Sequence, residues 1–164
     1  ADPEDKLPTI TMWLMGSLAN VSYRDVLLCA AIEIPCLAVA MILRWKMNLL
    51  SLEQEEARSL GINVKKLRLA VILIATIMTA VTVSVCGIIG WIGLVIPHIA
   101  RLLIGNDHRT LIPASALMGS IYLLLIDTAA RAATAGEVPL SILTAMVGAP
   151  FFAVILRKTS GGRE

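Results

Sequence analysis

The sequence has few charged residues for its length. Asp, Glu, Lys and Arg together make up 16% of the 164 residues, whereas a soluble domain usually carries about 25% because its surface must face water. Hydrophobic residues make up 57%, and the mean hydropathy is +0.82. These values exclude an ordinary soluble globule, because the polar residues are too few to cover it. Part of the surface is therefore expected to face a lipid bilayer.

Motifs for catalysis and for cofactor or metal binding are missing as well. No nucleotide-binding P-loop occurs, so the chain is not expected to hydrolyse ATP or to be an enzyme. His98 has no second ligand at zinc-site spacing, so we expect a hydrogen bond near Arg101 and no metal site.

Cys29 and Cys36 lie about 10.5 Å apart along a helix, too far for a disulfide. The net charge of +2 indicates no nucleic-acid partner, and no cofactor is expected.

Long apolar runs are what the sequence does contain. The first two are each 18 residues long, which as helices measure about 27 Å and match a hydrocarbon core of about 30 Å. The runs are continuously apolar and do not alternate, which disfavours strands. We predict an all-α fold, a polytopic transmembrane helical bundle with about five spans. The five stretches are residues 26–43, 69–86, 88–104, 111–133 and 138–156.

The basic residues are distributed unevenly between the two ends of such a bundle. With five alternating spans, one side receives eleven of the fourteen Lys and Arg residues, leaving Lys6, Arg24 and Arg131 for the other. The positive-inside rule makes the richer side cytoplasmic. We therefore predict a multi-pass protein of the inner (plasma) membrane with its C-terminus in the cytoplasm.

The predicted organisation has three parts. Residues 1–23 form an extracytoplasmic segment at the membrane interface, residues 24–157 form the transmembrane bundle, and residues 158–164 form a cytoplasmic tail. The first residue is not Met and the chain opens in a loop, so a piece of a longer protein is expected. The cytoplasmic side includes one long loop, residues 48–68.

This long loop has helix-capping signals of its own. Ser51 is a candidate N-cap with Gln54 three residues later, and Gly61 is a candidate C-cap. Asn63 is placed to cap a second short helix through Leu67. The pattern predicts two short helices hinged at the glycine. Such a segment serves either as a solvated basic linker or as a docking surface for a soluble partner.

Four segments carry a more specific resemblance. They are EEARSLGINVKK (55–66), GIIGWIGLVIPHIARLLIGNDHR (87–109), GAPFF (148–152) and MWLMGSL (12–18). Together, and in their order along the chain, they resemble the permeases of the FecCD type, which belong to iron-siderophore and vitamin B12 importers. The resemblance covers nearly the whole chain.

The resemblance implies a ten-helix permease of which this chain is the sixth to tenth helices. In that family two permease copies pair around a central pathway, cytoplasmic ATPase subunits bind the coupling loops, and a substrate-binding protein docks outside. The implied function is a permease subunit of an ATP-binding-cassette importer for a metal chelate such as iron-siderophore, haem or cobalamin. The implied ATPase-docking residues are Glu55, Glu56, Ala57, Arg58, Ser59, Leu60 and Gly61.

Two other functions remain open at this point. The chain could be a truncated or split permease half that acts as a membrane interaction module without transport. A secondary transporter would need paired charges inside the membrane, and Glu33 and Asp127 are the candidates. Glu33 has no basic partner within its own helix, so we expect it to be protonated or paired elsewhere. The cargo also stays open, since iron chelates, haem, cobalamin and oxyanions all fit the scaffold.

Charged residues near the extracytoplasmic end suggest a second docking site. Asp127 and Arg131 are four residues apart on one predicted helix, so they can pair. A purely structural pair is one interpretation. The family resemblance implies instead that Arg131 meets an acidic residue of the docked binding protein, with Asp127 as its support.

Small residues mark two further candidate features. Ser141, Thr144 and Gly148 share one face of the last predicted helix, where they line the pathway by family resemblance or allow tight helix packing. A second group is expected to bend and shorten the third span, either as a helix break or through close packing of small residues. This helix-break group comprises Gly87, Gly90, Gly93 and Pro97.

Overall fold

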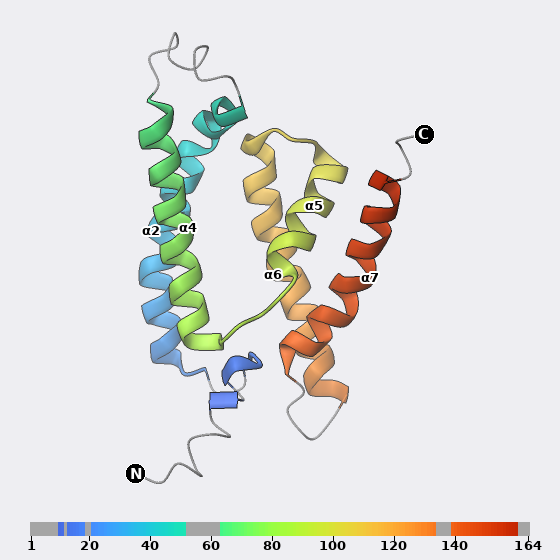
Figure 1. Cartoon of the computed structure of the whole chain (residues 1–164). Helices are drawn as coiled ribbons and strands as arrows, with labels where there is room; N and C mark the ends of the chain where they lie inside the picture. Colours follow the sequence, from blue (N-terminus) through green and yellow to red (C-terminus); the bar gives the residue numbers. More distant parts are fainter. Residues whose placement is uncertain (1–9, 12, 19–20, 52–62, 134–138, 161–164) are drawn as a thin grey trace.

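The computed structural model describes residues 10–11, 13–18, 21–51, 63–133 and 139–160. Its regular elements are all helical (Figure 1), as predicted. α2 packs against α4, and α5, α6 and α7 pack on one another, with α6 also contacting α2. The elements are α2 (Tyr23–Met47), the 3₁₀ turn η1 (Asn48–Ser51), α4 (Val64–Cys86), α5 (Ile92–Ile104), α6 (His108–Ala133) and α7 (Leu140–Ser160).

Polar caps decide where the first two long helices begin. At α2, the Ser22 hydroxyl accepts from the backbone N–H of Asp25, and the Asp25 carboxylate accepts from the backbone N–H of Ser22. This capping box starts the helix three residues before the predicted apolar run. At α4, the Asn63 side chain accepts from the backbone N–H of Lys66 at 3.1 Å.

The prediction of a separate short helix after Asn63 was wrong. Asn63 is indeed an N-cap, but the helix that it starts continues without interruption to Cys86. The physical reason is that no glycine or proline separates Arg68 from the apolar run that follows, and extending a helix costs far less than starting a new one. The first short helix predicted for this loop lies outside the described residues.

The helices differ in length. Three of them, Tyr23–Leu50, Val64–Cys86 and His108–Ala132, are long and apolar enough to cross a membrane, whereas Ile92–Ile104 and Leu140–Ala153 are shorter apolar helices. Consecutive helices run in opposite directions (Figure 1). The prediction of five helices is confirmed, with three of full spanning length.

The buried residues concentrate where α5, α6 and α7 meet. Five residues here are almost completely buried: Val95, Ala100, Leu111, Leu140 and Thr144. By contrast, at most 6% of the residues in the spanning segment of each of the three long helices are buried. Their outward faces are large and apolar, so lipid or further helices must cover them.

Candidate functional site

The two ends of the bundle carry different charges. One end holds the C-termini of α2 and α5, the N-termini of α4 and α6, and the C-terminal part of α7 (Figure 1). Most of the basic side chains of the helices lie here, and we call it the basic end; the other is the opposite end. The residues concerned are Arg44, Lys46, Lys65, Lys66, Arg68, Arg101, Arg109 and Arg157.

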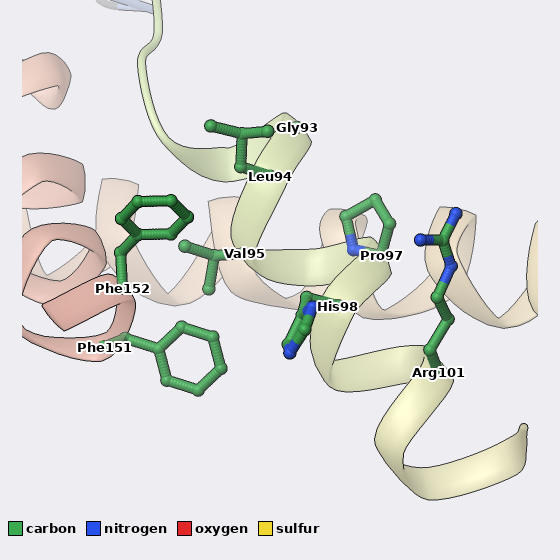
Figure 2. Close-up of a pocket in the computed structure, with 8 residues that line it drawn as sticks. All are labelled: Gly93, Leu94, Val95, Pro97, His98, Arg101, Phe151 and Phe152. Atoms are coloured by element: carbon green, nitrogen blue, oxygen red, sulfur yellow. The ribbon is translucent and has the colours of Figure 1, made fainter. Parts of the chain in front are cut away.

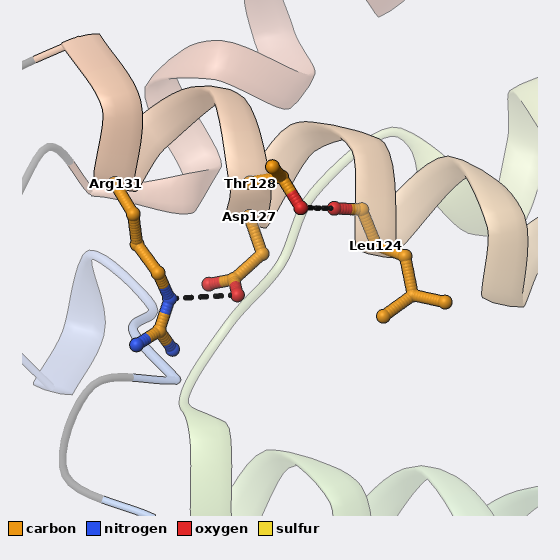
Figure 3. Close-up of polar contacts among 4 residues, drawn as sticks. All are labelled: Leu124, Asp127, Thr128 and Arg131. Atoms are coloured by element: carbon orange, nitrogen blue, oxygen red, sulfur yellow. Dashed lines mark hydrogen bonds and ion pairs between the residues drawn. The ribbon is translucent and has the colours of Figure 1, made fainter.

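At the opposite end, α6 presents the predicted ion pair. Nε of Arg131 lies 2.8 Å from Oδ2 of Asp127 (Figure 3), which confirms the pair. The Arg131 side chain is 60% exposed and that of Asp127 only 22%. Figure 3 shows the terminal nitrogens of Arg131 on the side away from the carboxylate. Asp127 thus holds the guanidinium in one orientation, and the two terminal nitrogens of Arg131 make no hydrogen bond to any residue that the structure describes.

The break between α4 and α5 lies at Gly87–Trp91. Gly87 has φ +72°, and a side chain there would collide with the backbone oxygen of Trp13. Trp91 has φ +67° and no side-chain cap, which is strained for a bulky residue. Gly90 and Gly93, by contrast, have no described atom within 4 Å of where a side chain would begin. Close backbone contact therefore explains Gly87 and not the other two glycines.

Pro97 lies inside α5 and does not end a helix. Pro97 belongs to the predicted helix-break group, yet α5 continues through it from Ile92 to Ile104. A proline inside a helix removes one backbone hydrogen bond, and packing around it can offset that loss. Here Ile96 and Ala100 are buried, which holds the helix together across the proline.

A short N-terminal segment, residues 13–17, ties the opposite end together. The backbone N–H of Ser17 donates to the Cys86 carbonyl, and that of Leu140 donates to the Gly16 carbonyl, each at 3.0 Å. The Ser141 hydroxyl donates to the Met15 carbonyl at 2.5 Å. The segment thereby joins the end of α4 to the start of α7. Sequence reasoning placed these residues at the membrane interface and missed this role.

The three small residues of α7 all contact other parts of this chain or their own helix. Ser141 binds the Met15 carbonyl, and Thr144 is fully buried with its hydroxyl donating to the Ser141 carbonyl at 3.1 Å. A Cβ at Gly148 would lie 2.5 Å from Cβ of Trp91. These contacts correspond to the tight-packing interpretation. The pathway-lining role of the same residues stays a prediction.

A cavity of about 300 Å³ lies between α5 and α7. The His98 ring meets Phe151 edge-on, with centroids 6.3 Å apart, and no hydrogen bond of His98 occurs within the described ranges. The predicted hydrogen bond near Arg101 is therefore replaced by an aromatic contact. Figure 2 shows the lining residues Gly93, Leu94, Val95, Pro97, His98, Arg101, Phe151 and Phe152.

Glu33 has a partner that sequence reasoning did not identify. Its Oε1 lies 2.8 Å from the hydroxyl oxygen of Thr82, so the contact joins α2 to α4. The same hydroxyl lies 2.9 Å from the carbonyl of Met78. Among the described residues, no group of three His, Cys, Asp or Glu residues is placed to hold a metal ion.

At the basic end, Asp107 caps the start of α6. Its Oδ1 accepts from the backbone N–H of Arg109 at 2.9 Å. That bond, and a second from the Asn48 side chain, lower the pKa of the Asp107 carboxyl below its usual value of 3.8. The predicted ATPase-docking residues, Glu55 to Gly61, lie outside the described residues.

An all-α arrangement of antiparallel apolar helices with one basic end defines a multi-pass membrane protein. The chain belongs to the FecCD transport family, whose sequence profile matches residues 2–158. It is 42% identical over 162 residues to the molybdate import system permease protein MolB of Haemophilus influenzae, covering 99% of this chain and 48% of MolB. It is 39% identical over 157 residues to the hemin transport system permease protein HmuU of Yersinia pestis, covering 94% of this chain and 47% of HmuU.

A solved structure of an ABC transporter contains the same fold. It is an inward-facing conformation of an ABC transporter assigned to the metal-chelate type, with a TM-score of 0.91 and 42% identity. The match covers 96% of this chain and 51% of that one. This chain therefore spans about half the length of the relatives that it matches.

Proposed function

We propose that this chain is the C-terminal half of the permease subunit of an ABC importer in the inner membrane. The observation that carries the proposal is the structural match at TM-score 0.91 over 96% of the chain. The chain contributes no ATP-hydrolysing site of its own, since no P-loop occurs in its sequence. Its cargo is a metal chelate such as iron-siderophore, haem or cobalamin, or an oxyanion like the cargo named for MolB.

The proposed topology puts the basic end in the cytoplasm. Arg44, Lys66 and Arg109 lie at this end, whereas Arg131 lies at the other. The positive-inside rule supports this orientation. With the basic end in the cytoplasm, residues 55–61 would be accessible to a cytoplasmic ATPase subunit.

Two further partners follow from the same topology. An extracytoplasmic substrate-binding protein would dock on Arg131, which Asp127 orients and which is 60% exposed. A second permease copy would pair with this one around the pathway and cover part of the exposed apolar surface. α7 would border that pathway. Because Trp91 covers Gly148 here, Gly148 would line it only after α7 moves away from Trp91.

Reconstitution of the whole transporter tests the proposal. The permease that contains this chain is placed in proteoliposomes with its ATPase subunit and binding protein. Uptake of labelled iron chelate, haem, cobalamin and molybdate is then followed with and without ATP. We expect ATP-dependent uptake of one of these cargoes. A complex that assembles and yet takes up none of them would instead support the non-transporting interaction module.

A further inference from the structure

We infer that Asn48, Asp107 and His108 form a rigid joint that passes movement from η1 to the turn between α5 and α6. This inference rests on the proposed function, in which the segment after η1 docks an ATPase subunit. Asn48 is the first residue of η1, and Asp107 and His108 lie at the start of α6. The joint thus connects two segments about sixty residues apart in the sequence.

The side chain of Asn48 makes both kinds of hydrogen bond at once. Its Nδ2 donates to Oδ1 of Asp107 at 2.7 Å, and its Oδ1 accepts from the backbone N–H of His108 at 2.8 Å. Nδ1 of His108 also lies 2.8 Å from this oxygen, so Nδ1 carries the proton and donates. An amide is the side chain that offers a donor and an acceptor on one planar group. A carboxylate at position 48 would instead face Asp107 with like charge.

The end of α2 adds two contacts to the same turn. Arg44 donates from Nη1 to the carbonyl of Arg109 at 3.0 Å. The Arg109 guanidinium carbon lies 5.9 Å from the ring centroid of Trp45, within the range of a cation–π contact. Arg44, Trp45 and Asn48 therefore hold residues 107–109 from one side. The turn cannot move relative to the end of α2 without breaking several of these contacts together.

The turn itself is well suited to pass such movement on. α5 ends at Ile104 with Gly105 as its C-cap at φ +87°, and α6 begins at His108. The connection is so short that displacing residue 107 displaces the ends of both helices. α5 in turn contacts α7 and forms one wall of the cavity at His98 and Arg101.

The bonds of Asn48 to Asp107 and of Arg44 to Arg109 are exposed, whereas the two contacts of Asn48 with His108 are partly buried. Each such hydrogen bond makes only a small net contribution to the folding free energy, because water competes for the same groups. They do, however, define one relative position of η1 and the turn. Losing them should therefore change how movement is transmitted more than it changes folding.

The first test replaces Asn48 in the full permease, assembled with its ATPase subunit and binding protein. We expect N48A and N48D to bind the ATPase subunit normally and to melt near the wild-type temperature. The amount of cargo moved per ATP hydrolysed should fall about fivefold or more, the range of a typical coupling free energy. K46A, at a neighbouring basic residue with no described contact to the turn, is the matched control and should leave this ratio unchanged. An unchanged ratio in N48A would overturn the inference.

The second test restores the joint covalently. Cys29, Cys36 and Cys86 are first replaced, and N48C and D107C are combined and bridged with a short bifunctional thiol reagent. The unbridged variant should be poorly coupled, and bridging should raise cargo moved per ATP again. If bridging abolished the remaining uptake, the contact would have to open during transport, and the rigid joint would be wrong. A wild-type permease without ATP-dependent uptake would instead contradict the proposed function itself.

Discussion

The indole of Trp91 occupies the space into which a side chain at Gly148 would extend. A Cβ at Gly148 would lie 2.5 Å from Cβ and 2.8 Å from Cγ of Trp91. The Trp91 ring also meets Phe152 edge-on, with centroids 6.2 Å apart. Because Trp91 has a left-handed backbone conformation, the loop has little freedom to withdraw the ring. The approach of α7 to the α4–α5 loop therefore depends on a glycine at position 148.

G148A should accordingly destabilise the permease. Overpacking of this kind typically costs about 1–3 kcal/mol, and thermal unfolding in detergent would measure it. G119A is the matched control, because its new methyl group would meet only Cγ2 of Ile96 at 3.9 Å. A helix-interior alanine there should stabilise by roughly 0.5–1 kcal/mol. Equal effects of the two substitutions would contradict the packing described here.

A second pair of glycines gives an independent prediction for the α4–α5 loop. G87A introduces a side chain at φ +72° and against the Trp13 carbonyl, so it should strongly reduce folded protein after membrane extraction. G90A should be tolerated, because no described atom lies within 4 Å of its new methyl group. Size-exclusion profiles of the two variants test this difference. A monodisperse G87A at wild-type yield would show that residues 13–17 do not pack as described.

Arg131 should control docking of the binding protein. R131E reverses the charge of the exposed guanidinium and should weaken binding-protein affinity at least about tenfold, as a lost interface charge pair does. ATPase activity without the binding protein should not change. R24E is the matched control, since Arg24 is another exposed arginine of the opposite end. If R24E and R131E weakened binding equally, general electrostatic attraction would explain the result and specific docking on Arg131 would not.

The Glu33–Thr82 contact should contribute measurably to the packing of α2 on α4. E33A should destabilise by about 0.6 kcal/mol, the average for hydrogen bonds between transmembrane helices, and by no more than about 1.7 kcal/mol. E33Q should retain most of the stability, because the glutamine amide keeps an oxygen and also offers a donor to Thr82. Thermal unfolding of both variants in a T82V background completes a double-mutant cycle. A coupling energy near zero would mean that the 2.8 Å contact adds nothing to stability.

The carboxyl of Asp107 should titrate below its usual pKa of 3.8. A lowered folded-state pKa means that the stabilising contribution is complete above the unfolded-state pKa and is lost as the pH falls through the folded-state value. The cap on α6 should therefore be intact at neutral pH and lost only in strong acid. In N48A the pKa should rise towards 3.8 but stay below it, because the Arg109 N–H remains. A ¹³C NMR titration of labelled aspartate would measure both values.

Features that depend on local spacing were correctly predicted from the sequence. The ion pair of Asp127 and Arg131 follows from a separation of four residues on one helix, and the cap by Asn63 follows from its place just before a run of helix-forming residues. The five helices follow from continuous apolar runs. Two local details were wrong. Asn63 starts a long helix instead of a short one, and Pro97 lies within a helix, because in both cases the neighbouring residues continue the helix.

By itself, then, the sequence determined that this is an all-α membrane chain of five helices with one basic end, because helix formation and charge distribution depend on residues close together in the chain. Only the tertiary structure decided which side chains meet. The contacts that decide the packing join residues 49 to 59 positions apart in the sequence. They are Asn48 with Asp107, Glu33 with Thr82, and Trp91 with Gly148. The physical reason is that apolar helices in lipid gain nothing from hydrophobic burial against one another. Their relative placement depends on individual close contacts and hydrogen bonds, which no local pattern in the sequence specifies.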